Sequence, residues 1–92
     1  MSYIVECWHH AKVYRKGDLE DDLILEGEHT LPTRKEAKQL IENRLSKLKN
    51  VRREYHRGVQ PSVCVGWTGK RWTNENTGEE CLEFYKYILR KL

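Results

Sequence analysis

The feature that most constrains the fold is a helix start in the middle of the chain. Thr33 and Glu36 have the spacing of a capping box, in which the threonine hydroxyl accepts from the Glu36 amide and the glutamate reaches back. Pro32 disfavours helical backbone at Leu31, so the helix cannot begin earlier. These residues predict a helix that starts at position 33 and buries its apolar side against another element.

Apolar residues recur after this start at intervals of three and four. They are Ala37, Leu40, Ile41, Leu45, Leu48, Val51 and Tyr55. This spacing predicts one long amphipathic helix, with Arg57 in its last turn and Gly58 just past its end. Arg44 falls within the apolar stripe, which leaves two alternatives open: a bend or break at residues 45–49, or a snorkelling arginine.

The residues before the helix predict an antiparallel hairpin. Residues 3–14 place apolar side chains at every second position, as a half-buried strand does. A polar, acidic turn follows, and residues 23–26 resume as a second strand.

The residues after the helix predict a meander. Residues 63–67 alternate as a strand, residues 71–73 form a short strand, and residues 74–78 form a polar turn. Residues 79–92 fit either a strand or a helix, and their aromatic content favours the strand.

The predicted fold class is α+β. Residues 1–92 form one small domain, in which an antiparallel sheet, made of the N-terminal hairpin and the C-terminal meander, packs on one long central amphipathic helix. The chain has no apolar run near the roughly 18 residues of a membrane span, and its start does not have the pattern of a signal peptide. Three widely spaced cysteines without a CxxC pair fit reduced thiols, so we expect a cytoplasmic protein.

No catalytic motif stands out. Cys7, His9 and His10 lie close in sequence, and Cys64 or Cys81 would be needed to complete a four-ligand zinc site. A cysteine–histidine nucleophile is the other enzymatic hypothesis, but the chain has no GxSxG, HExxH, GxGxxG or GxxxxGK[ST] motif. We therefore expect a non-enzymatic protein without a metal or another cofactor.

Charge is distributed unevenly along the chain. Residues 1–30 carry a net −4, residues 31–58 a net +6 and residues 59–92 a net +1. A basic excess on one side of a helix favours a polyanionic partner. Two tryptophans flanking a basic turn form a second candidate surface. The predicted partner-binding or nucleic-acid-binding residues are Arg34, Lys35, Lys38, Lys49, Arg53, Lys70, Arg71 and Trp72.

Two resemblances bear on function. The stretch Leu31-Pro32-Thr33-Arg34-Lys35-Glu36-Ala37, placed after a strand pair, resembles the strand-to-helix entry of the arm-type DNA-binding domains of integrases. This resemblance implies a small nucleic-acid-binding module whose sheet enters the major groove of DNA.

The second resemblance is one of type. A tiny, cysteine-poor α+β domain with split charge and no catalytic motif resembles the small phage-encoded inhibitors of host defence, especially anti-CRISPR proteins of the type I-F sort. It implies a protein that binds a host CRISPR effector ribonucleoprotein through its protein subunits and its guide RNA. We rank this inhibitor hypothesis first and the DNA-binding module as the alternative.

Overall fold

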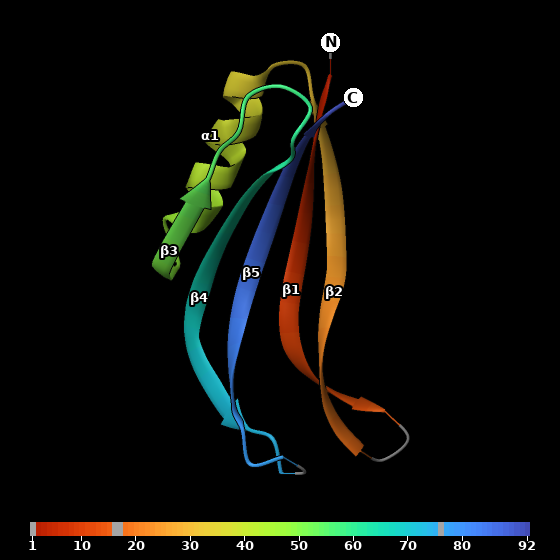
Figure 1. The fold of residues 1–92 in the computed structure, drawn as a ribbon, viewed down its shortest axis with the longest axis vertical. Helices are drawn as coiled ribbons and strands as arrows, with labels where there is room; N and C mark the ends of the chain where they lie inside the picture. Colours follow the sequence, from red (N-terminus) through yellow and green to blue (C-terminus); the bar gives the residue numbers. More distant parts are fainter. Residues whose placement is uncertain (1, 16–17, 76) are drawn as a thin grey trace.

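The chain forms one antiparallel sheet with a helix on one of its faces (Figure 1). The structure, a computed structural model, describes residues 2–15, 18–75 and 77–92. The elements are β1 (Tyr3–Arg15), β2 (Asp18–Leu31), α1 (Arg34–Leu45), β3 (Lys49–Glu54), β4 (Ser62–Thr73) and β5 (Glu80–Lys91). Within the described residues the strand order is β2-β1-β5-β4-β3.

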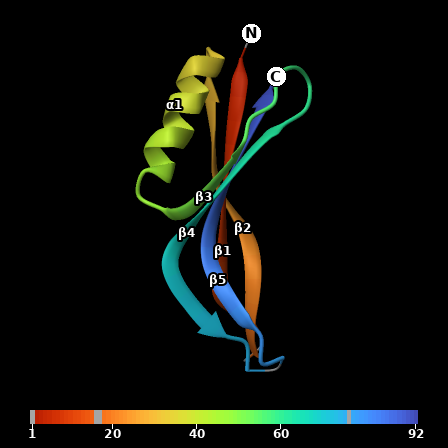
Figure 2. The same ribbon diagram turned by 60° about the vertical axis from the view of Figure 1, so that its left-hand side comes forward.

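The chain crosses the sheet once. β1 and β2 form a hairpin at one edge, and α1 then carries the chain over one face to β3 at the opposite edge (Figure 2). β3 pairs with β4, and β4 turns back into β5, which closes the sheet by pairing with β1. Both chain ends consequently lie at the same end of the molecule (Figure 1).

The core lies between α1 and the sheet. Its buried side chains are Val5, Cys7, Ala37, Ile41, Leu45, Cys64, Tyr87 and Leu89. The core residues that come from β1 and β5 all have odd numbers, because alternate side chains of a strand point to opposite faces of the sheet. The even-numbered residues of β1 and β5 therefore lie on the face away from α1.

The predicted long helix is wrong. α1 ends at Leu45 after 12 residues, and the residues expected to continue it form strand β3. The amide of Ser46 closes the helix by donating to the carbonyl of Glu42 at 3.0 Å, and Asn50 then adopts a left-handed φ of 49°. The prediction was a long central helix packed along the whole sheet. In the structure the helix is short, and the sheet extends beyond it.

Two local predictions agree with the structure. The Oγ1 atom of Thr33 accepts a hydrogen bond of 3.2 Å from the amide of Glu36, which is the predicted capping interaction. The C-terminal segment that fitted either conformation is strand β5. Within the described residues, no helix is long and apolar enough to cross a membrane.

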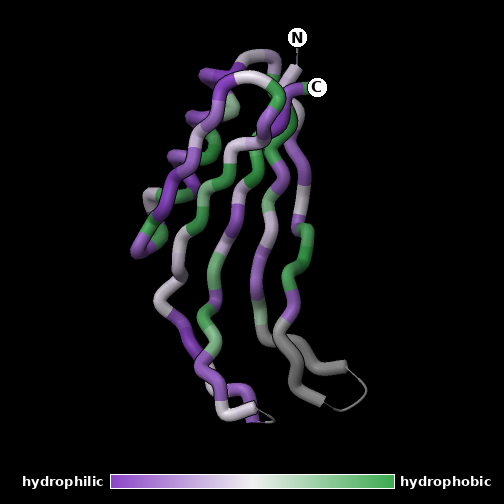
Figure 3. Tube along the Cα trace, in the orientation of Figure 1, coloured by the Kyte–Doolittle hydropathy of each residue, from purple (hydrophilic) through white to green (hydrophobic). Residues whose placement is uncertain are grey.

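The molecule is more extended than a compact domain of its size. Its principal extents are 45 × 27 × 19 Å, and its radius of gyration is 14.9 Å, whereas a compact chain of this length has about 12 Å. Its accessible surface is 6430 Å², compared with about 5,600 Å² expected from its mass. Hydrophobic segments continue along the strands beyond the level of the helix (Figure 3). The sheet therefore leaves apolar surface without a second layer.

Candidate nucleic-acid interface

The sheet face away from α1 carries two rows of aromatic, aliphatic and basic side chains. Strand register places residues of the five strands side by side in the order β2-β1-β5-β4-β3. One row consists of Leu25, Trp8, Lys86, Val65 and Arg52, and the next of Leu23, His10, Phe84, Trp67 and Lys49. We call these ten residues the open face.

Aromatic rings stack on one another across the open face. The imidazole of His10 lies 4.7 Å from the ring centroid of Phe84 and 5.6 Å from that of Trp72. Its Nδ1 atom donates to the carbonyl of Leu82 at 2.7 Å, which fixes the orientation of the ring. The rings of Phe84, Trp72 and His10 remain partly exposed. They form a rigid stack to which a further flat ring can be added.

Trp67 extends this aromatic surface along β4. Its Nε1 atom donates to the carbonyl of Lys70 at 2.9 Å, and the guanidinium of Arg71 lies 5.8 Å from its ring centroid. Arg71 also pairs with Glu80 at 3.0 Å. Because the indole is held by the irregular segment of its own strand, between Trp67 and Arg71, it presents its ring without further ordering of the side chain.

The aliphatic part of the open face is exposed at its β2 edge. Leu23 and Leu25 keep 37% and 40% of their surface accessible, although both are large apolar residues. Contiguous apolar surface of this kind is typical of a binding site.

The charge of the open face is positive. Lys86, Arg52 and Lys49 form no ion pair with any carboxylate in the described part of the chain, and neither row contains an acidic residue. Carboxylates begin in the adjacent row, where Glu28 lies opposite Glu6. The Glu6 carboxylate accepts from Trp8 Nε1 at 3.3 Å and lies 3.7 Å from Arg90. The acidic row therefore marks one limit of the basic and aromatic surface.

The predicted site residues divide between two sides of the molecule. Lys49 belongs to the open face, and Lys70, Arg71 and Trp72 lie on β4 next to it. Lys70 is exposed and forms no ion pair among the described residues.

The other four predicted residues lie on the helix side. Arg34, Lys35 and Lys38 line a groove of about 400 Å³ along α1, together with Gln39 and Glu42. Within this group, Lys38 Nζ lies 4.5 Å from the Tyr55 ring centroid, and Arg53 Nε donates to the Glu42 carboxylate at 2.9 Å. Lys49 and Arg53, which were predicted to share one flank of the helix with Lys35 and Lys38, lie instead on strand β3.

Trp8, Phe84, Lys86 and Arg52 of the open face were not among the site residues predicted from the sequence. The sequence signal that points to these residues is the alternation of side chains along a strand, which assigns the residues of β1 and β5 to two opposite faces of the sheet. Alternation alone does not say which face a helix covers, because both faces of β1 carry apolar residues, such as Val5 on one and Trp8 on the other.

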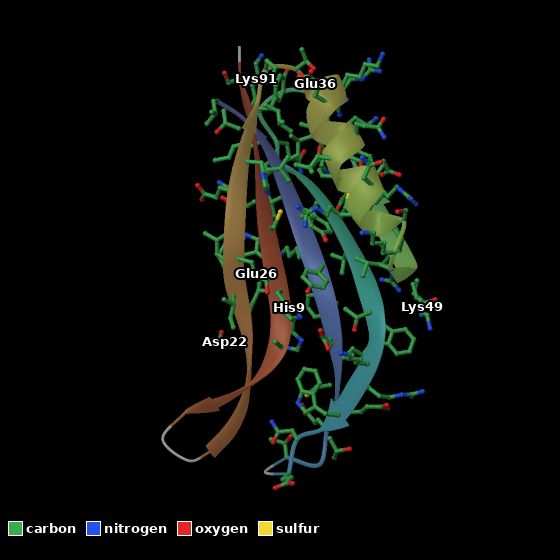
Figure 4. The ribbon with its side chains drawn as sticks, turned by 180° about the vertical axis from the view of Figure 1, so that it is seen from behind. His9, Asp22, Glu26, Glu36, Lys49 and Lys91 are labelled. Carbon is green, nitrogen blue, oxygen red and sulfur yellow. The ribbon has the colours of Figure 1, made fainter. Side chains whose placement is uncertain are left out.

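The residues considered for zinc binding have other partners. His9 Nδ1 lies 2.8 Å from Glu26, and the two side chains lie close together in Figure 4. The Nε2 atom of His9 lies 2.8 Å from Glu83, and its ring stacks on Tyr85 with the ring centroids 4.3 Å apart. A neutral imidazole donates through one nitrogen only, so both contacts are hydrogen bonds when the ring carries two protons. His9 is thereby a bridge between β2 and β5 on the helix side, whereas His10 lies on the open face.

Cys7 shares a face with His9 and lies in the core. Burial raises the pKa of its thiol, and the nearby Arg44 offsets only part of that effect. A raised thiol pKa disfavours the thiolate that metal binding and nucleophilic attack require. Among the residues that the structure describes, no three histidine, cysteine, aspartate or glutamate side chains are placed to hold a metal ion.

Comparison of the chain with protein-family models, with curated proteins and with solved structures found no match. The architecture and the surface therefore define the class of protein: a five-stranded antiparallel sheet with one face under a short helix and one aromatic, basic face open.

Proposed function

We propose that the protein is a non-enzymatic nucleic-acid-binding protein that holds a single-stranded segment on its open face. The observation that carries the proposal is the combination of stacked rings with cations that have no carboxylate partner. Proteins that bind single strands combine a positively charged surface with aromatic side chains on which bases stack. Sheets are a common platform for such recognition.

The composition of the open face favours a single strand over a duplex. Base stacking on Phe84 and Trp67 requires bases whose own faces are free, and these are paired and stacked within a duplex. Readout of a DNA major groove requires polar side chains that reach base edges. The rings and aliphatic residues of the open face provide few such groups, which weakens the arm-type DNA-binding hypothesis.

The inhibitor hypothesis is a second candidate, and the charges at the two sheet edges favour it. β2 contains six acidic residues and no lysine or arginine, whereas β3 contains Lys49, Arg52 and Arg53 with one glutamate. A ribonucleoprotein offers both basic protein subunits and RNA phosphates, which matches two edges of opposite charge. We propose a CRISPR surveillance complex as such a partner. Co-purification with the complex and protection of phage from it are the expected results, and the absence of both would contradict this candidate.

The nucleic-acid proposal is tested by fluorescence anisotropy with labelled single-stranded RNA, single-stranded DNA and duplex DNA at two salt concentrations. We expect the single strands to bind more tightly than the duplex. The logarithm of affinity should fall with the logarithm of salt with a slope of about −0.7 per phosphate contact.

Two lysine variants test which surface of the protein binds the nucleic acid. Lys86→Gln removes a cation from the open face, and Lys35→Gln removes an exposed cation from α1. We expect Lys86→Gln to weaken binding and to reduce the salt slope by about one contact, while Lys35→Gln has little effect. A larger loss with Lys35→Gln, or tighter binding of the duplex, would contradict the proposal.

A further inference from the structure

A second group of cations converges at the end of the molecule where the chain termini lie. A cavity of about 350 Å³ is lined there by Tyr3, Arg34, Arg57, Gly58 and Lys91. These residues come from β1, α1, the β3–β4 connection and β5, and Tyr3 lies opposite Lys91 in the sheet register. Lys91 and the first turn of α1 lie at the same end of the molecule in Figure 4.

The charges around this cavity are not balanced by carboxylates. None of Arg34, Arg57 and Lys91 forms an ion pair within the part of the chain that the structure describes, and no acidic residue lines the cavity. Glu36, in the first turn of α1, accepts instead from the Thr33 hydroxyl at 3.3 Å. Three cations that face one space repel each other, and an anion placed between them relieves this repulsion.

The cavity is partly preorganised. The Arg34 side chain is held by a hydrogen bond of 3.1 Å from its Nη2 atom to the carbonyl of His56. Gly58 has a φ of 91°, and a Cβ atom built on it would have no neighbour within 4 Å. At Gly58 the cavity is therefore bordered by backbone without a side chain. The open space beside this backbone leaves room for a bulky anion.

We infer that this cavity binds a phosphate group. Arginine guanidinium groups match phosphate oxygens through two parallel hydrogen bonds, and the lysine adds a point charge. The Tyr3 hydroxyl supplies a further donor. The phosphate is carried either by a free small molecule or by the end of an oligonucleotide, and the two sources share the same recognition chemistry.

The inference is tested first with inorganic phosphate alone. Phosphate is titrated against chloride at matched ionic strength while the amide resonances of the labelled protein are followed by NMR. We expect saturable shifts at Tyr3, Gly58 and Lys91. Arg57→Gln should weaken binding about tenfold, the loss expected from one charged hydrogen bond. Arg44→Gln, which removes an arginine of α1 that lies outside the cavity and outside the open face, should leave phosphate binding unchanged.

Absence of saturable shifts, or equal phosphate affinity in Arg57→Gln and the unmodified protein, would overturn the inference. Both arginines are exposed, so neither substitution removes a core contact. This first experiment does not depend on the proposed nucleic-acid function.

A second experiment rests on the proposed function and identifies the source of the phosphate. Anisotropy compares single strands that carry a 5′-phosphate with strands that end in a 5′-hydroxyl. Tighter binding of the phosphorylated strand, lost in Arg57→Gln, supports terminal-phosphate recognition. Equal affinity of the two strands, with inorganic phosphate still bound, supports a free phosphate compound. If no strand binds but phosphate does, the proposed function fails and the phosphate site stands.

Discussion

At the residue scale, the contact between the sheet and the end of the helix depends on Gly66. This glycine lies buried in β4, beneath Leu48 of the turn that follows α1. A Cβ atom at Gly66 would lie 2.6 Å from both Cβ and Cδ1 of Leu48, well inside van der Waals contact. The absence of a side chain here is what lets the chain leave α1 close to the sheet and enter β3.

We therefore predict that Gly66→Ala destabilises the protein by about 1–3 kcal/mol, the usual result of overpacking a core. Gly27→Ala in β2 is the matched control, because a Cβ atom there would have no neighbour within 4 Å. Urea unfolding followed by circular dichroism measures both free energies of unfolding. Equal stability of the two variants would show that Leu48 does not pack on Gly66.

The capping box supports a second prediction at this scale. Thr33→Ala removes the acceptor of the Glu36 amide, and we expect a loss of about 1 kcal/mol. Glu36→Gln keeps a side chain that is compatible with the motif and should cost less. The same unfolding experiment checks both, and an equal or larger loss for Glu36→Gln would contradict the importance of the Thr33 cap.

At the scale of elements, α1 and β3 are joined by a polar cluster around Glu42. Its carboxylate accepts from Arg53 Nε at 2.9 Å and from the Tyr55 hydroxyl at 2.7 Å. The hydrogen bond from Arg53 is the main reason that the pKa of Glu42 is lowered from 4.5, and the Tyr55 hydroxyl lowers it further. The cluster ties the short helix to the strand that replaces its predicted continuation.

This cluster predicts a pH dependence. A lowered folded-state pKa means that the ionised carboxylate stabilises the fold fully above pH 4.5, and that this contribution is lost as the pH falls through the folded-state pKa. Glu42→Gln should lower stability at pH 7 and make the decline of stability below pH 4.5 shallower. Thermal unfolding at a series of pH values checks the prediction. A variant whose stability falls as steeply in acid as that of the unmodified protein would contradict it.

The elements also show what could be predicted from the sequence. The capping box located the helix start, and period-two alternation located β1 and β4. The helix end could not be read from the spacing, because Val51 and Tyr55 are four residues apart and therefore lie on one side of either a helix or a strand. The pairing of β3 with β4, a contact between segments joined by a turn, decides between the two.

The same limit applies to the candidate site. The charge pattern of the sequence identified basic residues such as Lys49 and Lys70. It did not show that α1 covers one face of the sheet and that Phe84 and Lys86 lie on the other. That assignment depends on the crossing of α1 from β2 to β3, which is a property of the tertiary structure.

At the scale of the whole molecule, the large accessible surface and the extended shape have one cause. A single helix of 12 residues covers part of one face of a sheet whose longest strands have 13 and 14 residues. The opposite face carries the aromatic rings and the unpaired cations together. The proposed function uses this face, and the inferred phosphate site lies at the end of the molecule near both termini.

Intrinsic tryptophan fluorescence tests directly whether a single strand binds on the open face. The chain has three tryptophans. Trp8 and Trp67 belong to the open face, and Trp72 stacks on His10 of that face. Titration with an unlabelled single-stranded oligonucleotide at low salt should quench their emission to saturation, because bases stacked on the rings provide a new path of decay. Raising the salt should weaken the quenching. Binding detected by anisotropy without any change in tryptophan emission would place the nucleic acid elsewhere and contradict the account.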